Sequence, residues 1–374
     1  MTVEREQGPM ADVGLVEKQV FTLERFTTIG GATLKNVRVG WESYGRLNAD
    51  KSNAVLVTHY FSGTSHAAGR YAASDPLPGY WDAVIGPGKA IDTDKYFVVS
   101  SDTLTNLNAY DPNVVTTGPA SMDPDTGRPY GMSFPVVQIG DFVNVQKALV
   151  ERLGITKLKA VAGPSMGALQ AYAWAATYPE MVERIVPVIG AAGGDPFIIA
   201  WLGLWAQPIR LDPKWNGGDY YGRELPLEGV RGALKVVVMQ ANQAGWARET
   251  WGRNPADPAR PPEAALDNRF AVELGVEELA GLRAAAVDAN NFLYLVKANQ
   301  LQGTDPSRIR CPALLPYAPD DLIFPEEWVL RTARAIADAG NHVETVVLNG
   351  PYGHLNGLAC IGQAGPTIAR FLER

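Results

Sequence analysis

Cysteine is scarce in this sequence: among 374 residues there are only Cys311 and Cys360. Two cysteines cannot build a disulfide framework or a cysteine metal cluster. One disulfide between them stays formally open, but we interpret both as small buried residues in a reducing compartment. Residues 1–20 carry scattered charges without the apolar run of a signal peptide, and no stretch approaches the roughly 20 apolar residues of a membrane helix. These absences predict a soluble, cytoplasmic protein with no membrane partner.

An excess of positive charge is also missing. The formal net charge is −7, which argues against a nucleic-acid partner because such proteins normally present a basic face. There are only four histidines, and His59 and His66 lack carboxylates at ligand spacing, so we expect no metal site. Apolar residues make up 46% of the chain, which is enough for a sizeable core.

Short apolar runs recur along the chain and are bounded by turn residues. Because they do not alternate with polar residues, they are typical of strands buried on both faces of a parallel sheet. The runs cover residues 54–59, 95–100, 158–162, 184–189, 313–317 and 343–348. Helical patterns lie between them, as at 142–153 and 169–177, and this alternation predicts an α/β fold. Residues 20–45 alternate around Gly30-Gly31 and predict antiparallel strands at one sheet edge.

The strand pattern stops between residues 193 and 302. This segment is rich in tryptophan and proline, and residues 276–300 have helical periodicity. We predict a core formed by residues 1–192 and 303–374, with 193–302 as a helical lid insertion over the carboxyl ends of the strands, where ligands bind in open α/β sheets. Residues 201–205 suit an acyl-chain pocket, although lid core or a dimer contact is the favoured interpretation.

The segment Gly163-Pro164-Ser165-Met166-Gly167 has the pattern Gly-x-Ser-x-Gly. The pattern is weak by itself, but here a predicted strand runs into it and a predicted helix runs out. That strand–turn–helix context is typical of the nucleophile elbow of α/β hydrolases. The serine then lies at a helix N-terminus, where the N–H of Met166 can donate to an oxyanion. We predict Ser165 as a nucleophile.

A serine nucleophile needs a base, and this fold orders its residues as serine, acid, histidine. His59 and His66 precede the serine, and His342 begins a predicted strand, where a structural role fits better. His354 follows the last predicted strand, which is the expected place for the base.

The acid should follow the penultimate strand, where Asp320 and Asp321 are adjacent. We favour Asp321 because it lies four residues before Pro325, a spacing common for the acid in this fold, and keep Asp320 as the alternative. A second oxyanion donor should follow the strand that ends near His59. The N–H of Phe61 is the first choice and that of Tyr60 the second.

Long stretches of the chain resemble the homoserine O-acetyltransferase family of α/β hydrolases. The resemblance runs from about residue 21 to 371 and rests on residues 41–48, 81–97, 117–121, 126–135 and 288–295. It implies Ser165, Asp321 and His354 as a catalytic triad, with oxyanion donors at Phe61 and Met166. It also implies acetyl transfer from acetyl-CoA to homoserine, and a homodimer formed through the lid.

Several positions depart from the family pattern. Leu355 follows the histidine where members have the aspartate that holds the amino group of homoserine. Leu234 stands where members carry an arginine, and residues 241–243 replace a Tyr-Arg-Ser run. Residues 105–110 replace a Gly-Gly-Cys loop. Pro164 and Ala168 stand where the elbow usually has glycine.

These departures cluster around the acyl acceptor and spare the triad. A buried charge left without its partner costs about 2–5 kcal/mol, so homoserine should bind poorly. The leading hypothesis is therefore an enzyme that hydrolyses small acetyl-type esters through an acyl-enzyme, without a cofactor. The alternatives are a homoserine O-acetyltransferase with displaced ligands, which would use acetyl-CoA as acyl donor, and a non-catalytic protein that binds partners through the helical insertion.

Overall fold

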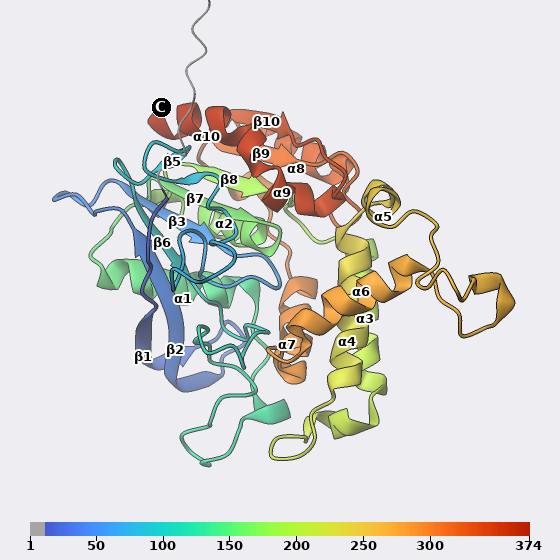
Figure 1. The fold of residues 1–374 in the computed structure, drawn as a ribbon. Helices are drawn as coiled ribbons and strands as arrows, with labels where there is room; N and C mark the ends of the chain where they lie inside the picture. Colours follow the sequence, from blue (N-terminus) through green and yellow to red (C-terminus); the bar gives the residue numbers. More distant parts are fainter. Residues whose placement is uncertain (1–11) are drawn as a thin grey trace, which may run out of the picture.

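The computed structural model describes residues 12–374 and centres on an eight-stranded sheet (Figure 1). The strand order is β1-β2-β6-β3-β7-β8-β9-β10; β1 and β2 are antiparallel to their neighbours, and the remaining pairs are parallel. The strands are β1 (Gln19–Thr27), β2 (Thr33–Tyr44), β3 (Ala54–Thr58), β6 (Phe97–Ser101), β7 (Ala160–Pro164), β8 (Ile185–Val188), β9 (Ala313–Tyr317) and β10 (Val343–Val347). A separate small pair joins β4 (Ile85–Gly86) to β5 (Ile91–Asp92).

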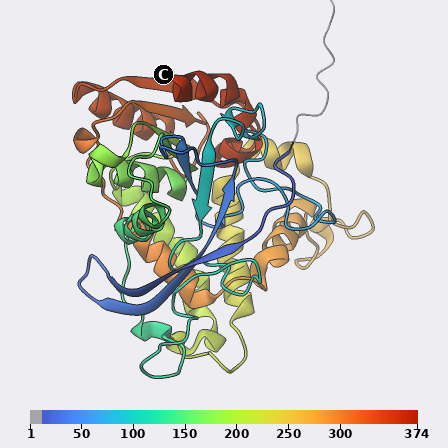
Figure 2. The ribbon, with the colours of Figure 1, turned by 90° about the vertical axis from the view of Figure 1, so that its left-hand side faces the viewer.

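Every predicted strand is present, with ends shifted by no more than two residues. The antiparallel edge predicted around Gly30-Gly31 is the β1–β2 hairpin, which is drawn in blue in Figure 2. Its turn closes when the N–H of Gly31 donates to the carbonyl of Thr28. Gly31 has φ of 86°, a left-handed conformation that glycine adopts without strain. The α/β class expected from the sequence is confirmed.

Helices cover both faces of the sheet, because successive strand residues point to opposite sides. On β3, Leu56 belongs to the apolar cluster that includes α1 (Ile139–Arg152), α2 (Met166–Thr177) and α8 (Glu326–Asp338). Its neighbour Val57 belongs to the cluster on the other face, with α10 (Gly365–Glu373). Both side chains are fully buried, which explains why the sequence of β3 lacks alternation. The expected burial on both faces is wrong for β10, because it is the edge strand of the sheet and its residues are only partly buried or exposed.

Five helices fill the segment between β8 and β9 and gather on the side of the molecule away from β1 and β2 (Figure 1). They are α3 (Pro196–Leu211), α4 (Leu227–Ala241), α5 (Ala244–Thr250), α6 (Ala271–Ala284) and α7 (Ala289–Gln300). Residues 276–300, for which the sequence predicts helical structure, lie in α6 and α7, and residues 285–288 separate the two helices. Asp288 caps the start of α7, because its carboxylate accepts the N–H of Asn291 at 2.7 Å.

Asp288 also joins the lid to the rest of the chain. Tyr110, from the loop after β6, donates to its carboxylate at 2.9 Å, and Tyr220 and Tyr221, between α3 and α4, donate at 2.5 and 3.1 Å. The carboxylate is fully buried, and this burial raises its pKa. Three hydroxyl donors compensate for the lost hydration. We refer to these four residues as the tyrosine anchor.

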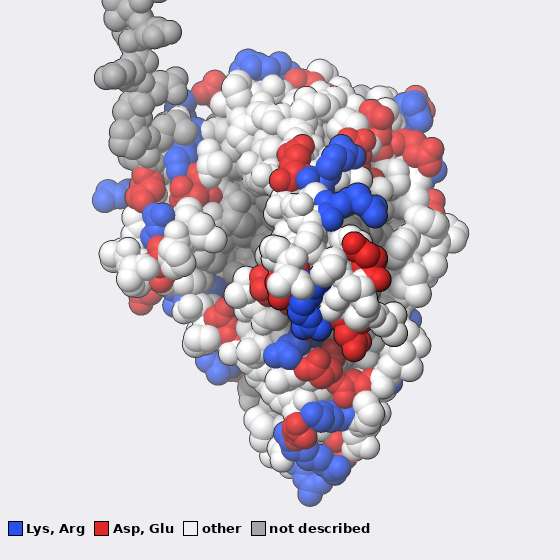
Figure 3. Space-filling view, turned by 45° about the vertical axis from the view of Figure 1, so that its right-hand side comes forward, with Lys and Arg blue, Asp and Glu red and all other residues white. Residues whose placement is uncertain are grey.

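The surface carries charges of both signs. On the face that Figure 3 shows, Lys and Arg side chains intermingle with Asp and Glu. No helix within residues 12–374 is long and apolar enough to cross a membrane. Neither cysteine forms a disulfide; Cys311 is buried as expected, whereas Cys360 is partly exposed, contrary to the expectation that both are buried.

Candidate active site

Ser165 lies in a tight turn between β7 and α2. Its φ of 58° and ψ of −119° are strained for a residue with a side chain. The turn packs on the end of β3, and a Cβ on Gly163 or on Gly167 would collide with Thr58. The Thr58 hydroxyl completes the contact by donating to the carbonyl of Gly167 at 2.8 Å. Only glycine fits at these two positions, which explains the Gly-x-Ser-x-Gly pattern.

His354 and Asp321 meet Ser165 at the carboxyl edge of the sheet. The Nε2 atom of His354 is 2.8 Å from the Ser165 hydroxyl, and its Nδ1 atom is 2.7 Å from an Asp321 oxygen. All three residues are buried. The other histidines lie elsewhere: His66 contacts Glu42, and His342 is exposed beside Glu344. A hydroxyl, an imidazole and a carboxylate in this order form a chain that can deprotonate the serine as it attacks a carbonyl.

Of the two adjacent aspartates, Asp321 is the one that contacts His354. Its second oxygen accepts the N–H groups of Ile323 and Phe324, at 2.7 and 2.9 Å. These bonds fix the carboxylate plane toward the imidazole. Asp320 is exposed and points its backbone carbonyl toward Gly353.

The two residues predicted as oxyanion donors, Phe61 and Met166, lie near Ser165. Neither the N–H of Phe61 nor that of Met166 donates a hydrogen bond to another group in residues 12–374. Phe61 lines the same cavity as Ser165, and Met166 is the first residue of α2. Unpaired buried N–H groups are rare. A bound carbonyl oxygen that acquires negative charge would satisfy both of them.

The loop that carries Phe61 is held by two side chains that no sequence motif indicates. Gln170, on α2, donates to the carbonyl of His59 at 3.2 Å, and Asn106 donates to the carbonyl of Gly63 at 3.0 Å. Asn106 belongs to the loop that replaces the family's Gly-Gly-Cys sequence. Only its place in that altered loop could have drawn attention to it.

His59 supports the same loop. Its Nδ1 atom is 2.7 Å from the carbonyl of Tyr60, and its Nε2 atom accepts the N–H of Thr103 at 3.2 Å. An Nε2 that accepts is unprotonated, so the ring is the neutral Nδ1–H tautomer. Complete burial lowers the pKa of His59 to about 4, which keeps this tautomer at neutral pH.

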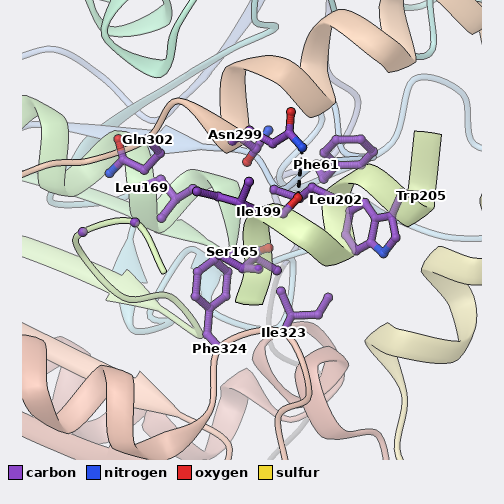
Figure 4. A pocket seen from close by; sticks show the side chains of 14 residues that line it. Phe61, Ser165, Leu169, Ile199, Leu202, Trp205, Asn299, Gln302, Ile323 and Phe324 are labelled. Carbon is purple, nitrogen blue, oxygen red and sulfur yellow. Dashed lines mark hydrogen bonds between the residues drawn. The ribbon is translucent and has the colours of Figure 1, made fainter. Parts of the chain in front are cut away.

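A cavity of about 30 Å³ that is partly open to solvent adjoins the serine and is lined by α3, α7 and the loops around β3 and β9. Its walls are apolar near Leu169, Ile199, Leu202, Trp205 and Phe324 and carry the carboxamides of Asn299 and Gln302 (Figure 4). Ile198 and Gln300 also line it. None of the residues that line it is charged. In residues 12–374 no three His, Cys, Asp or Glu side chains are grouped so that they could hold a metal ion.

Sequence and structure comparisons place the chain among known enzymes. No protein-family model matches it. A homoserine O-acetyltransferase from Methanococcoides burtonii is 43% identical over 76% of this chain, which spans 57% of that protein's length. Further relatives of that name are 34–40% identical and are covered over 74–98% of their length.

Two solved structures extend the similarity. An esterase is 47% identical, with 96% of this chain and 100% of that chain covered and a TM-score of 0.92. A homoserine O-acetyltransferase from Bacillus anthracis is 35% identical, with 96% and 98% covered and a TM-score of 0.91.

The chain belongs to the homoserine O-acetyltransferase family. It is a serine enzyme of the α/β-hydrolase fold. The family resemblance and the fold expected from the sequence are therefore confirmed.

The family's acceptor positions hold no charge in this member. Leu234 is buried, and Lys235 lines a groove on the outer side of the lid rather than the catalytic cavity. Gln243 caps α5 by accepting the N–H of Gly245, and Asn242 donates to the carbonyl of Val238.

The two elbow departures are accommodated by the packing. Pro164 is the last residue of β7, so its missing N–H does not interrupt the hydrogen bonds within the strand. Ala168 is tolerated because residue 190 is glycine: a Cβ on Gly190 would lie 2.5 Å from the Ala168 methyl. Gly190, just after β8, therefore leaves the space that the Ala168 methyl needs.

Proposed function

We propose that this enzyme hydrolyses small carboxylic esters of the acetyl type through an acyl-enzyme on Ser165. The observation that carries the proposal is the uncharged lining of the catalytic cavity. Homoserine has an ammonium and a carboxylate group, and each would lose its hydration in this cavity without gaining a charged partner. Water needs neither ligand, so it is the acceptor that fits best.

Acylation follows from the positions of the three side chains. The Ser165 hydroxyl attacks the ester carbonyl while His354 Nε2 takes its proton, and Asp321 stabilises the imidazolium that forms. The carbonyl oxygen becomes an oxyanion and accepts the N–H groups of Phe61 and Met166. When the intermediate collapses, the ester C–O bond breaks and His354 returns the proton to the leaving alcohol.

Deacylation repeats these steps with water. His354 takes a proton from the attacking water, the tetrahedral intermediate forms in the same oxyanion site, and the Ser165–acyl bond breaks. The proton returns to the serine, and the products are a carboxylic acid and the free enzyme. The reaction needs no metal and no cofactor, because every proton transfer uses His354.

The test compares the rate on an activated acetyl ester with the formation of O-acetylhomoserine from acetyl-CoA and homoserine. We expect rapid ester hydrolysis, little transfer to homoserine, and loss of hydrolysis in Ser165→Ala. Ser133→Ala, which changes an exposed serine, is the matched control. Transfer to homoserine at a rate comparable to hydrolysis would refute the proposal.

The second candidate is homoserine O-acetyltransferase activity with acetyl-CoA as donor. It is favoured by the names of the relatives and by the fold match to the Bacillus anthracis enzyme. The same assay separates the two candidates. A non-catalytic binding role would require that Ser165→Ala leave ester hydrolysis unchanged.

We further propose that two copies associate through the lid. The outer groove between α3 and α4 is apolar, has a volume of about 460 Å³ and is lined by Phe197, Trp201, Lys235, Val236, Met239, Gln240 and Leu322. Phe197 is 58% exposed and Leu322 51%, and such grouped apolar side chains favour association. We expect a dimer by light scattering and a monomer for Phe197→Glu.

A further inference from the structure

Ile189, the residue after β8, has an unusual backbone conformation. Its φ is 46°, in the left-handed region that β-branched residues rarely adopt. The side chain is almost completely buried, and the N–H donates to the carbonyl of Pro316 on β9 at 2.8 Å. Strained residues of this kind persist only where the surrounding structure holds them, and they are concentrated at functional sites.

The strained residue adjoins the serine turn. The carbonyl of Val188, directly before it, accepts the N–H of Ser165 at 2.9 Å. Gly190, directly after it, packs under the turn, since a Cβ there would lie 2.5 Å from the Ala168 methyl and 3.3 Å from the Ser165 carbonyl oxygen. The backbone on both sides of Ile189 is therefore fixed to the elbow.

The Ile189 side chain points to the segment that carries the histidine. A Cβ on Gly357, at the start of α9 (Asn356–Ala359), would lie 2.5 Å from its Cδ1 and Cγ1 atoms and 2.8 Å from Cγ2. Gly357 is three residues after His354 and is also fixed by its carbonyl, which accepts the indole N–H of Trp81 at 3.0 Å. The side-chain oxygen of Asn356 accepts the N–H of Tyr352 and closes the same turn.

We propose that Ile189 is a positioning residue that sets the distance between the Ser165 hydroxyl and His354 Nε2. Its backbone is fixed to the turn that carries the nucleophile, and its side chain is the surface on which the histidine segment rests. The inference rests on the proposed serine chemistry. Ile189 does not line the catalytic cavity, so it acts on the rate of the chemical step and not on substrate binding.

The test is a size exchange between Ile189 and Gly357. Gly357→Ala forces a methyl against the isoleucine, and we expect kcat for an acetyl ester to fall about 10- to 100-fold with KM nearly unchanged, since a displacement of about 1 Å costs this much. Ile189→Ala removes all three carbons that the new methyl meets. The double variant should therefore recover most of the kcat lost in Gly357→Ala.

Two additional measurements keep the test decisive. Ile189→Ala alone leaves a gap next to the histidine segment, and we expect about a tenfold loss of kcat with an altered pH profile. If Gly357→Ala does not fold, the result for Ile189→Ala decides the test. Ile185→Ala, a buried residue on the same strand, is the matched control. It should lower the unfolding midpoint and leave kcat unchanged.

A fluorophosphonate probe separates this inference from the proposed substrate. Ser165 attacks phosphorus, fluoride leaves and His354 takes the serine proton, so the labelling rate reports serine–histidine geometry for any substrate. Slow labelling in Gly357→Ala that recovers in the double variant supports Ile189 even if acetyl esters prove to be poor substrates. The inference would be overturned if Gly357→Ala kept the kcat and the labelling rate of the wild type, or if the double variant recovered neither.

Discussion

The small size of the catalytic cavity predicts a preference for short acyl groups, and Leu202 is the residue to change. Leu202 is buried on α3 and lines the cavity. A cavity of about 30 Å³ admits only two or three water-sized groups, since one water needs about 10–15 Å³. An acetyl group fits, whereas a butyryl group must place two further methylenes.

The cost of those methylenes can be worked out. Each one left unburied forgoes about 0.8 kcal/mol, and crowding adds about 1–2 kcal/mol. The total of about 3 kcal/mol corresponds to a ratio of roughly 150 in kcat/KM between acetyl and butyryl esters. Leu202→Ala removes the branched end of a wall residue, so we expect the ratio to fall at least tenfold, through a gain on butyryl esters.

The assay is hydrolysis of acetyl, propionyl and butyryl esters that share one leaving group, with kcat/KM measured for each. Leu293→Ala is the matched control, because Leu293 is equally buried on α7 but lines a different pocket. Both variants should lose about 2–5 kcal/mol of stability, and only Leu202→Ala should change the ratio. Equal rates on acetyl and butyryl esters in the wild type, or an unchanged ratio in Leu202→Ala, would refute the reasoning.

Three other predictions concern residues around the triad. Asp321→Asn should lower kcat by about 10⁴-fold because the imidazole loses its orienting carboxylate, whereas Asp320→Asn should stay near wild type in the same ester assay. His59 has a pKa of about 4 in the folded protein and 6.5 in the unfolded chain. Because the unfolded chain binds the extra proton, the free energy of unfolding should fall by about 3 kcal/mol as the pH drops from 7 to 4. Urea unfolding at the two pH values should show this loss for the wild type, and His59→Gln should lack this contribution. Leu355→Asp restores the family's acidic residue and should raise O-acetylhomoserine formation at least tenfold, which mass spectrometry of the product would detect; no increase would contradict the idea that Leu355 prevents transfer to homoserine.

The parts of the site that depend on local patterns could be predicted from the sequence. Ser165, Asp321, His354 and Phe61 each follow a strand of the parallel part of the sheet, and parallel strands end at the same edge of the sheet. Knowing which strands are parallel is therefore enough to expect these residues near one another. Their geometry agrees with that expectation, and their catalytic roles remain predictions.

The supporting residues could not be predicted in the same way. Gln170 and Asn106 are 64 positions apart, yet both hold the loop that carries Phe61. Nothing in the sequence near Ile189 indicates a left-handed residue, since isoleucine disfavours that conformation. The boundary between α6 and α7 could not be predicted either, because the helical repeat continues on both sides of Asp288. Only the tertiary contacts between Asp288 and the tyrosines show that a new helix begins there.

The tyrosine anchor has a consequence for how the protein folds. Opening the lid as a rigid body would carry Asp288, Tyr220 and Tyr221 away from Tyr110, so the Asp288 carboxylate would lose one of its three hydroxyl donors. The loss of a donor to a buried carboxylate is costly. We therefore expect residues 12–192 and 303–374 to depend on the helical segment between β8 and β9 for their stability, and the two parts to melt in one calorimetric transition. By the same reasoning, a lid from a relative can be grafted onto this protein only if it supplies Asp288, Tyr220 and Tyr221 together, because their fourth partner, Tyr110, belongs to the loop after β6 and stays in place.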